Sequence, residues 1–193
     1  MTTFLRLKLV FGFAFALLTT NYFAQNNTAT KHYIGELYGG GVVFHTYLTP
    51  DGSTHGLILC LNDIQAEVKW GPLDIDVESS ENSWDGQANT SAIMMSIRDT
   101  NFAAGVCDVY KIQEFEDWYL PSILELNTLW GNLYDVNRVL SETKDAALVN
   151  PTLYWSSTES NDKSAWFFSF FDGKPSNYYD KSSLLSVRAI REF

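Results

Sequence analysis

Four aromatic residues stand outside the apolar stretches of the sequence and could bind a ring-shaped ligand. Trp70 and Trp84 fall in the irregular segment 65–87, and Tyr178 and Tyr179 lie at the edge of a turn near the C-terminus. Aromatic side chains offer a large apolar face with a polar edge, and binding residues concentrate in surface loops. We therefore treat these four residues as candidates for stacking on a ligand such as a sugar ring.

Three further tryptophans could also stack on a ligand, but a position in the core explains them better. Trp118, Trp155 and Trp166 sit in apolar or strand-like surroundings. Large aromatic residues in such contexts usually fill the core. We expect these three to be structural.

A second group could carry polar chemistry. Its members are Glu125, Glu159, Arg188 and Arg191. Buried charges need partners, so the first interpretation is a structural network of ion pairs and hydrogen bonds that joins a helix to the last strands. The alternative is a polar ligand site built from the same four side chains.

The acidic loop offers oxygen ligands at alternating positions, which suggests calcium. The candidates are Asp74, Asp76, Glu78 and Asp85. A helix–loop–helix calcium site would require glycine where Ser79 stands and glutamate where Asp85 stands. A solvated acidic loop is therefore the default expectation, with no cofactor and with calcium left as an alternative.

Covalent chemistry has little support in the sequence. There is no Gly-x-Ser-x-Gly motif and no evident His–Asp partnership for a nucleophile. Cys60 and Cys107 are the two cysteines, and in an exported chain they are expected to form a disulfide. Closing that loop would stabilise the fold by roughly 4 kcal/mol in the chain-entropy model. Two buried free thiols, or a reactive or metal-binding pair, are the alternatives.

The N-terminal sequence is typical of an export signal. Residues 1–24 combine two early cations with a short apolar run and are expected to be a signal peptide; a retained anchor is the competing interpretation. Residues 25–32 should then be a flexible N-terminus, and 33–193 a single domain. No second apolar run is long enough to span a bilayer, so we expect a periplasmic, outer-surface or secreted protein.

The composition and net charge limit the classes of partner that the protein can bind. The 193 residues carry a formal charge of −10, and removal of the signal peptide leaves 11 Lys and Arg against 23 Asp and Glu. Such a surface repels nucleic acids. With 46% apolar and 15% aromatic residues the chain can build a sizeable core. Glycans or surface proteins are the expected partners, and the oligomeric state stays open.

The elements that must position these residues follow from periodicity and turn chemistry. Apolar runs at 42–48 and 55–61 flank a Pro-Asp-Gly turn, which predicts a hairpin. Helices are expected at 91–98 with Asn89 as cap, at 102–109, and from Ser122 to about Leu140, where Glu125 completes a capping box. Strands are expected at 153–158, 166–171, 176–179 and 185–192. This order predicts an α+β fold with antiparallel pairing.

Several motifs, taken together, resemble one known family. They are, in order, 40–44 (GGVVF), 86–90 (GQANT), Cys107, 117–122 (DWYLPS) followed by Glu125 and Leu126, 154–159 (YWSSTE), 165–166 (AW) and 187–191 (VRAIR). The ordered set resembles the Lcl C-terminal domain family of bacterial exported proteins, over roughly 33–193. The resemblance implies a C-type lectin-like fold, with two main helices on a twisted antiparallel sheet and long loops. It also implies adhesion in some members, including binding of sulfated glycans.

This chain departs from that pattern in two respects. It has no collagen-like Gly-X-Y stalk, and it is strongly acidic, which opposes binding of sulfated glycans.

Three functional hypotheses follow from the sequence. The first is a non-catalytic adhesin-like module that binds carbohydrate or another surface macromolecule. The second is a structural or assembly protein of the cell envelope that acts through protein contacts. The third is an oxidase of the formylglycine-generating type, which requires accessible cysteines.

Overall fold

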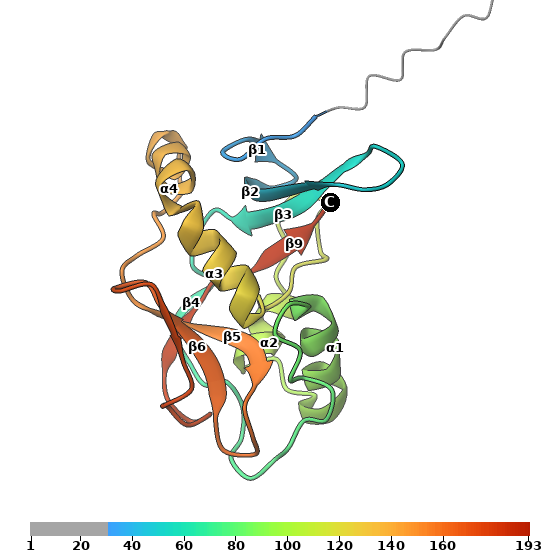
Figure 1. The fold of residues 1–193 in the computed structure, drawn as a ribbon. Coiled ribbons are helices and arrows are strands. Elements are labelled where there is room, and N and C mark those ends of the chain that lie inside the picture. The colour runs from blue at the N-terminus through green and yellow to red at the C-terminus, as the bar shows by residue number, and fades with distance from the viewer. Residues whose placement is uncertain (1–30) are drawn as a thin grey trace, which may run out of the picture.

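The structure, a computed structural model, describes residues 31–193 (Figure 1). The predicted signal peptide at 1–24 and most of the segment 25–32 lie outside these residues. The residues that the structure describes form two sheets and four helices, which confirms the predicted α+β class. No helix among the described residues is long and apolar enough to cross a membrane.

The first sheet contains the predicted hairpin. Its strands are β1 (Leu37–Tyr38), β2 (Gly41–Leu48), β3 (Thr54–Cys60) and β9 (Ile190–Glu192), in the order β1-β2-β3-β9. All neighbours are antiparallel. The hairpin turn is held by Asp51, whose carboxylate accepts hydrogen bonds from Thr49 and Ser53, while Gly52 adopts φ +85°. The local turn chemistry therefore produces the predicted hairpin.

The second sheet contains β4 (Gln65–Val68), β5 (Leu153–Glu159), β6 (Ala165–Ser169), β7 (Lys174–Ser176) and β8 (Leu185–Val187), in the order β4-β8-β5-β6-β7. One contact, Tyr154 beside Ser186, is parallel and the others are antiparallel. The expected strand 185–192 is in fact two strands. It breaks at Arg188 and Ala189, where the chain passes from the second sheet to the first. The expectation of one antiparallel sheet is therefore corrected to two.

The helices are α1 (Gly86–Ile97), α2 (Ala103–Asp108), α3 (Ile123–Gly131) and α4 (Leu133–Glu142). The capping box of Ser122 and Glu125 is present at the start of α3. The predicted single helix to Leu140 is interrupted, because the Asn132 side chain donates hydrogen bonds to the carbonyls of Phe44 and Thr128, at 3.0 and 3.3 Å. The predicted cap Asn89 instead lies inside α1, which Asp85 caps by accepting from the Ala88 amide.

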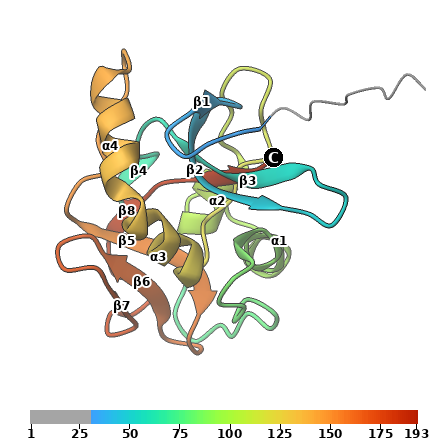
Figure 2. The ribbon, with the colours of Figure 1, turned by 45° about the horizontal axis from the view of Figure 1, so that its top comes forward.

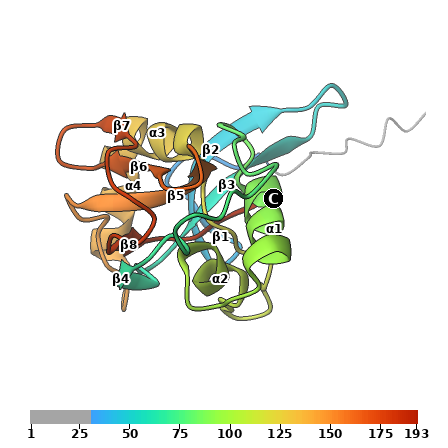
Figure 3. The ribbon, with the colours of Figure 1, turned by 90° about the horizontal axis from the view of Figure 1, so that it is seen from below.

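The two helix pairs cover different faces of the strands (Figures 2 and 3). Successive residues of a strand point to opposite faces, and the core follows this rule. Val43 and Trp155 belong to the cluster that contains residues of α1 and α2, whereas Val42 and Tyr154 belong to the cluster that contains residues of α3 and α4. The alternation in β2 and β5 thus gives the domain two separate cores.

Candidate functional site

Trp70, one of the four candidate aromatic residues, is buried. Its exposure is 0%, and its indole N–H donates to the Ser156 carbonyl at 2.8 Å. The Lys181 ammonium lies 4.7 Å from the ring centre. The prediction that Trp70 stacks on a ligand is wrong, because the long loop folds back against β5 and carries this side chain into the core.

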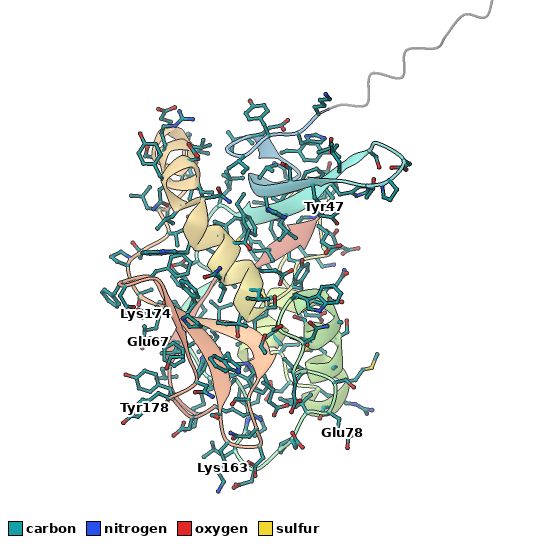
Figure 4. The ribbon with its side chains drawn as sticks, in the orientation of Figure 1. Tyr47, Glu67, Glu78, Lys163, Lys174 and Tyr178 are labelled. Atoms are coloured by element: carbon teal, nitrogen blue, oxygen red, sulfur yellow. The ribbon has the colours of Figure 1, made fainter. Side chains whose placement is uncertain are left out.

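The other three candidates are exposed but do not form one patch. Trp84 is 68% and Tyr178 85% exposed. Tyr178 and Tyr179 lie together, with ring centres 5.6 Å apart. Tyr179 and Trp84 line different hollows, and Tyr47, which shares the hollow of Trp84, lies at the opposite end of the molecule from Tyr178 (Figure 4). The structure therefore separates the tyrosine pair from the tryptophan.

A first hollow lies between the start of α3 and the strands β6 and β7. Its volume is about 360 Å³. Its lining residues are Glu81, Ser83, Ile123, Leu124, Asn127, Thr158, Trp166 and Pro175. Trp166 is half-buried there instead of forming part of the core, so its predicted structural role is incomplete. The side chains of Glu81, Ser83 and Asn127 make no hydrogen bond with the part of the chain that the structure describes.

A second hollow adjoins the first. Its volume is about 300 Å³. Its lining residues are His45, Tyr47, Leu57, Trp84, Leu124, Glu125, Thr128 and Glu192. Leu124 lines both hollows and is 48% exposed. Its amide donates to the Ser83 carbonyl at 3.0 Å, so the loop before α1 and the first turn of α3 together form a ridge between the hollows.

The loop that carries Ser83 and Trp84 is held in place by polar contacts on both sides. The Asn82 backbone carbonyl accepts a hydrogen bond from the Asn89 side-chain carboxamide at 2.6 Å and another from the Thr158 hydroxyl at 3.0 Å. The Asn82 carboxamide also accepts from the Trp84 amide at 2.9 Å. An exposed tryptophan on a loop fixed in this way is already ordered before it meets a ligand, which lowers the entropic cost of binding.

Both hollows are acidic. The Lys and Arg residues that the structure describes form no ion pair with Glu81, Asp85, Glu125 or Glu192, and none lines either hollow. Burial raises the pKa of Glu125, whose carboxylate accepts from the Ser122 amide at 2.6 Å and the Tyr119 hydroxyl at 3.0 Å. Burial, and then the nearby Glu125 carboxylate, also raises the pKa of Tyr119.

The four charged residues expected to form one network belong to separate ones. Glu159 pairs with Lys181, Arg188 with Asp63 at 3.3 Å, and Arg191 with Asp117 at 2.7 Å. Glu125 has no cationic partner among the described residues. Each set is structural in character, since Arg188 also donates to the carbonyls of Cys60, Leu61, Ala147 and Leu148. Sequence reasoning missed the partners Lys181, Asp63 and Asp117, and only Asp117 stood inside a recognised motif.

The predicted disulfide is not present. Cys60 and Cys107 are both free thiols with 0% exposure. The Cys60 thiol donates to the Asn62 carbonyl at 3.0 Å, and the apolar core around Cys107 accommodates a neutral thiol. Burial raises the pKa of Cys60 to about 11 and that of Cys107 well above its usual value. Neither sulfur is therefore an activated nucleophile.

The acidic loop does not assemble a cation site. Residues 31–193 contain no group of three or more His, Cys, Asp or Glu side chains placed to hold a metal ion. Asp85, one of the four calcium candidates, is used to cap α1. Asp74, Asp76 and Glu78 are exposed on the loop (Figure 4 labels Glu78).

Comparison with known proteins identifies the domain. The family model of the Lcl C-terminal domain matches residues 61–191. A search of curated proteins finds no match. Among solved structures, the domain is similar to a fimbrial protein from Bacteroides ovatus ATCC 8483, with a TM-score of 0.51 and 16% identity. That similarity covers 72% of this chain and 36% of the other, so it concerns the fold of about a third of the fimbrial protein.

Proposed function

Since the chain belongs to the Lcl C-terminal domain family, we propose that it is a surface or extracellular binding module that recognises carbohydrate through the first hollow. The observation that carries the proposal is the composition of this hollow. A half-buried tryptophan, a proline and two aliphatic side chains form its apolar part, and an amide, two hydroxyls and a carboxylate stand around them.

This combination suits a sugar. The apolar face of a pyranose ring packs against an aromatic side chain, here Trp166, while its hydroxyls need hydrogen-bond partners. Asn127 supplies both donors and acceptors, and Glu81 accepts bidentate hydrogen bonds from neighbouring hydroxyls. Because these side chains are not engaged by the rest of the described chain, binding would leave no protein partner unsatisfied.

The wider context supports a non-catalytic role outside the cytoplasm. An export signal is expected at 1–24, and the family is one of exported proteins. The C-type lectin-like fold that the family resemblance implies would place the ligand beside long loops, and the loop residues Glu81 and Ser83 line the first hollow and Trp84 the second. An oxidase of the formylglycine-generating type is not proposed, because it would need accessible cysteines and both thiols are buried.

A glycan array probed with the mature protein tests this function, with and without calcium. We expect binding to a glycan that is lost in Trp166→Ala and kept in Tyr178→Ala, a control that removes an exposed aromatic side chain that does not line the hollow. Absence of binding to every glycan, in both conditions, would contradict the carbohydrate proposal.

An assembly protein of the cell envelope is the second candidate. It is favoured by the apolar side chains exposed near the C-terminus, where Phe171 is 67%, Tyr178 85% and Leu184 53% exposed. Exposed aromatic groups of this kind are common at protein interfaces. Co-purification of a stoichiometric protein partner, lost in Tyr178→Ala and kept in Trp166→Ala, would favour this candidate over the first.

A further inference from the structure

We infer that the carbohydrate site continues across Leu124 into the second hollow, and that this second hollow receives a sugar unit bearing a free amino group. The inference rests on the proposed function, because it concerns the same surface. It goes further by specifying the ligand as an oligosaccharide with a positive charge.

The two hollows share a wall. Leu124 lines both, and the adjacent residues Ser83 and Trp84 each line one of them. The backbone hydrogen bond between Leu124 and Ser83 joins the two segments directly at 3.0 Å, so one ridge borders both hollows. A chain of linked rings seated in the first hollow therefore extends over Leu124 onto Trp84.

The size of the hollows favours an oligomer. At about 360 and 300 Å³, each lies at the lower end of the range for small-molecule sites. Each is suited to one or two sugar rings. The aromatic side chains Trp166 and Trp84, one in each hollow, provide a stacking surface for rings at both ends of such a ligand.

The charge of the second hollow favours an amine. Glu125 and Glu192 line it, and the described chain offers no Lys or Arg in its lining. Glu125 is 7% exposed, so its negative charge is poorly solvated, and its hydrogen bonds come from neutral donors. An ammonium group placed here would gain two carboxylates and the aromatic faces of Trp84 and Tyr47. A sulfate or carboxylate would be repelled.

The test compares two tetrasaccharides that differ only at nitrogen, the tetramers of β-1,4-linked glucosamine and of N-acetylglucosamine, by titration calorimetry at low and high salt. We expect the glucosamine tetramer to bind about fivefold more tightly at low salt, the ratio for a partly exposed ion pair. High salt should reduce this preference. Equal binding of the two tetramers, or tighter binding of the acetylated one, would overturn the inference.

Three variants test whether the effect comes from the second hollow. Glu192→Gln, which leaves only the Glu125 carboxylate, should reduce the preference for the amine, while Glu78→Gln, which removes the same charge from an exposed position on the acidic loop, should keep it in full. Trp84→Ala should weaken binding of the glucosamine tetramer at least fivefold. It should leave unchanged the binding of the N-acetylglucosamine disaccharide, which has no amino group and is short enough to occupy the first hollow alone. Equal responses of Glu192→Gln and Glu78→Gln, or equal losses for tetramer and disaccharide in Trp84→Ala, would contradict the second hollow.

The two proposals fail in different ways. If other glycans bind and depend on Trp166 but no glucosamine oligomer does, the inference is wrong and the proposed function stands. If no glycan binds at all, the proposed function is wrong, and the inference falls with it.

Discussion

Lys181 and Glu159 form an ion pair from which solvent is completely excluded, with 0% exposure of both side chains. The Glu159 carboxylate also accepts from the Val77 amide and the Ser80 hydroxyl, each at 2.8 Å, and the Lys181 ammonium donates to the Ile75 carbonyl at 2.7 Å. The pair therefore fastens the long acidic loop to the end of β5. The loop that this pair holds continues along the chain into the segment that carries Trp84.

Removing one member of this pair should be strongly destabilising. Glu159→Gln leaves the Lys181 charge buried without a counter-charge, and we expect a loss of about 3–5 kcal/mol in the free energy of unfolding. Urea denaturation measures it. Glu116→Gln is the matched control, because the Lys111–Glu116 pair is 66% exposed on both sides and should contribute less than about 1 kcal/mol. Similar losses in the two variants would show that burial of the pair is not important.

The turn before β7 depends on Gly173. Its φ is +71°, and a Cβ atom there would collide with the Trp130 indole. Gly173→Ala should lower the free energy of unfolding by about 2–3 kcal/mol through backbone strain plus steric overlap. Gly52→Ala separates the two causes, since Gly52 has φ +85° but no atom within 4 Å of its Cβ position. We expect it to lose only about 1 kcal/mol, and equal losses would argue against the contact with Trp130.

The Asp117–Arg191 pair should make stability depend on pH. Hydrogen bonds from Arg191 lower the pKa of Asp117, so this carboxylate stabilises the fold above its unfolded pKa of about 3.9, and that stabilisation is lost as pH falls through the lower folded value. Asp117→Asn should lower the free energy of unfolding by about 1 kcal/mol at pH 7, a value reduced for the 49% exposure of the Asp117 side chain.

Urea denaturation at pH 7 and pH 3 measures this dependence. The difference between the wild-type protein and Asp117→Asn should be smaller at pH 3. Glu114→Gln, at an exposed position without an ion pair among the described residues, should show no comparable difference at pH 7. A gap between wild type and Asp117→Asn that stays constant with pH would contradict the assignment.

The two cysteines should be unreactive in the native protein. Both are buried, and burial raises the pKa of each thiol. A thiol reagent at pH 8 should modify neither until urea unfolds the chain, and should then modify both. Rapid labelling without urea would contradict the burial of Cys60 and Cys107. Failure to label in urea, reversed by a reductant, would instead reveal the disulfide that the structure lacks.

Local signals in the sequence were sufficient for much of the fold. The Pro-Asp-Gly turn predicted the hairpin of β2 and β3, and Ser122 with Glu125 predicted the start of α3, because each signal acts within a few residues. The end of that helix could not be predicted in the same way. Asn132 interrupts it through a bond to Phe44, which lies 88 residues away in the sequence.

The sequence by itself determined the family, the α+β class and which residues are aromatic or charged. The tertiary structure alone decided which of them face solvent. Trp70 and Trp84 stand in the same loop, yet contact with β5 buries the first. The second is exposed on a segment that Asn89 and Thr158 hold in place by donating hydrogen bonds to the Asn82 carbonyl. The ion-pair partners of Glu159, Arg188 and Arg191 also could not be predicted. They lie 22, 125 and 74 residues away along the chain. Such pairs form only when the two sheets pack, so they leave no pattern in the sequence.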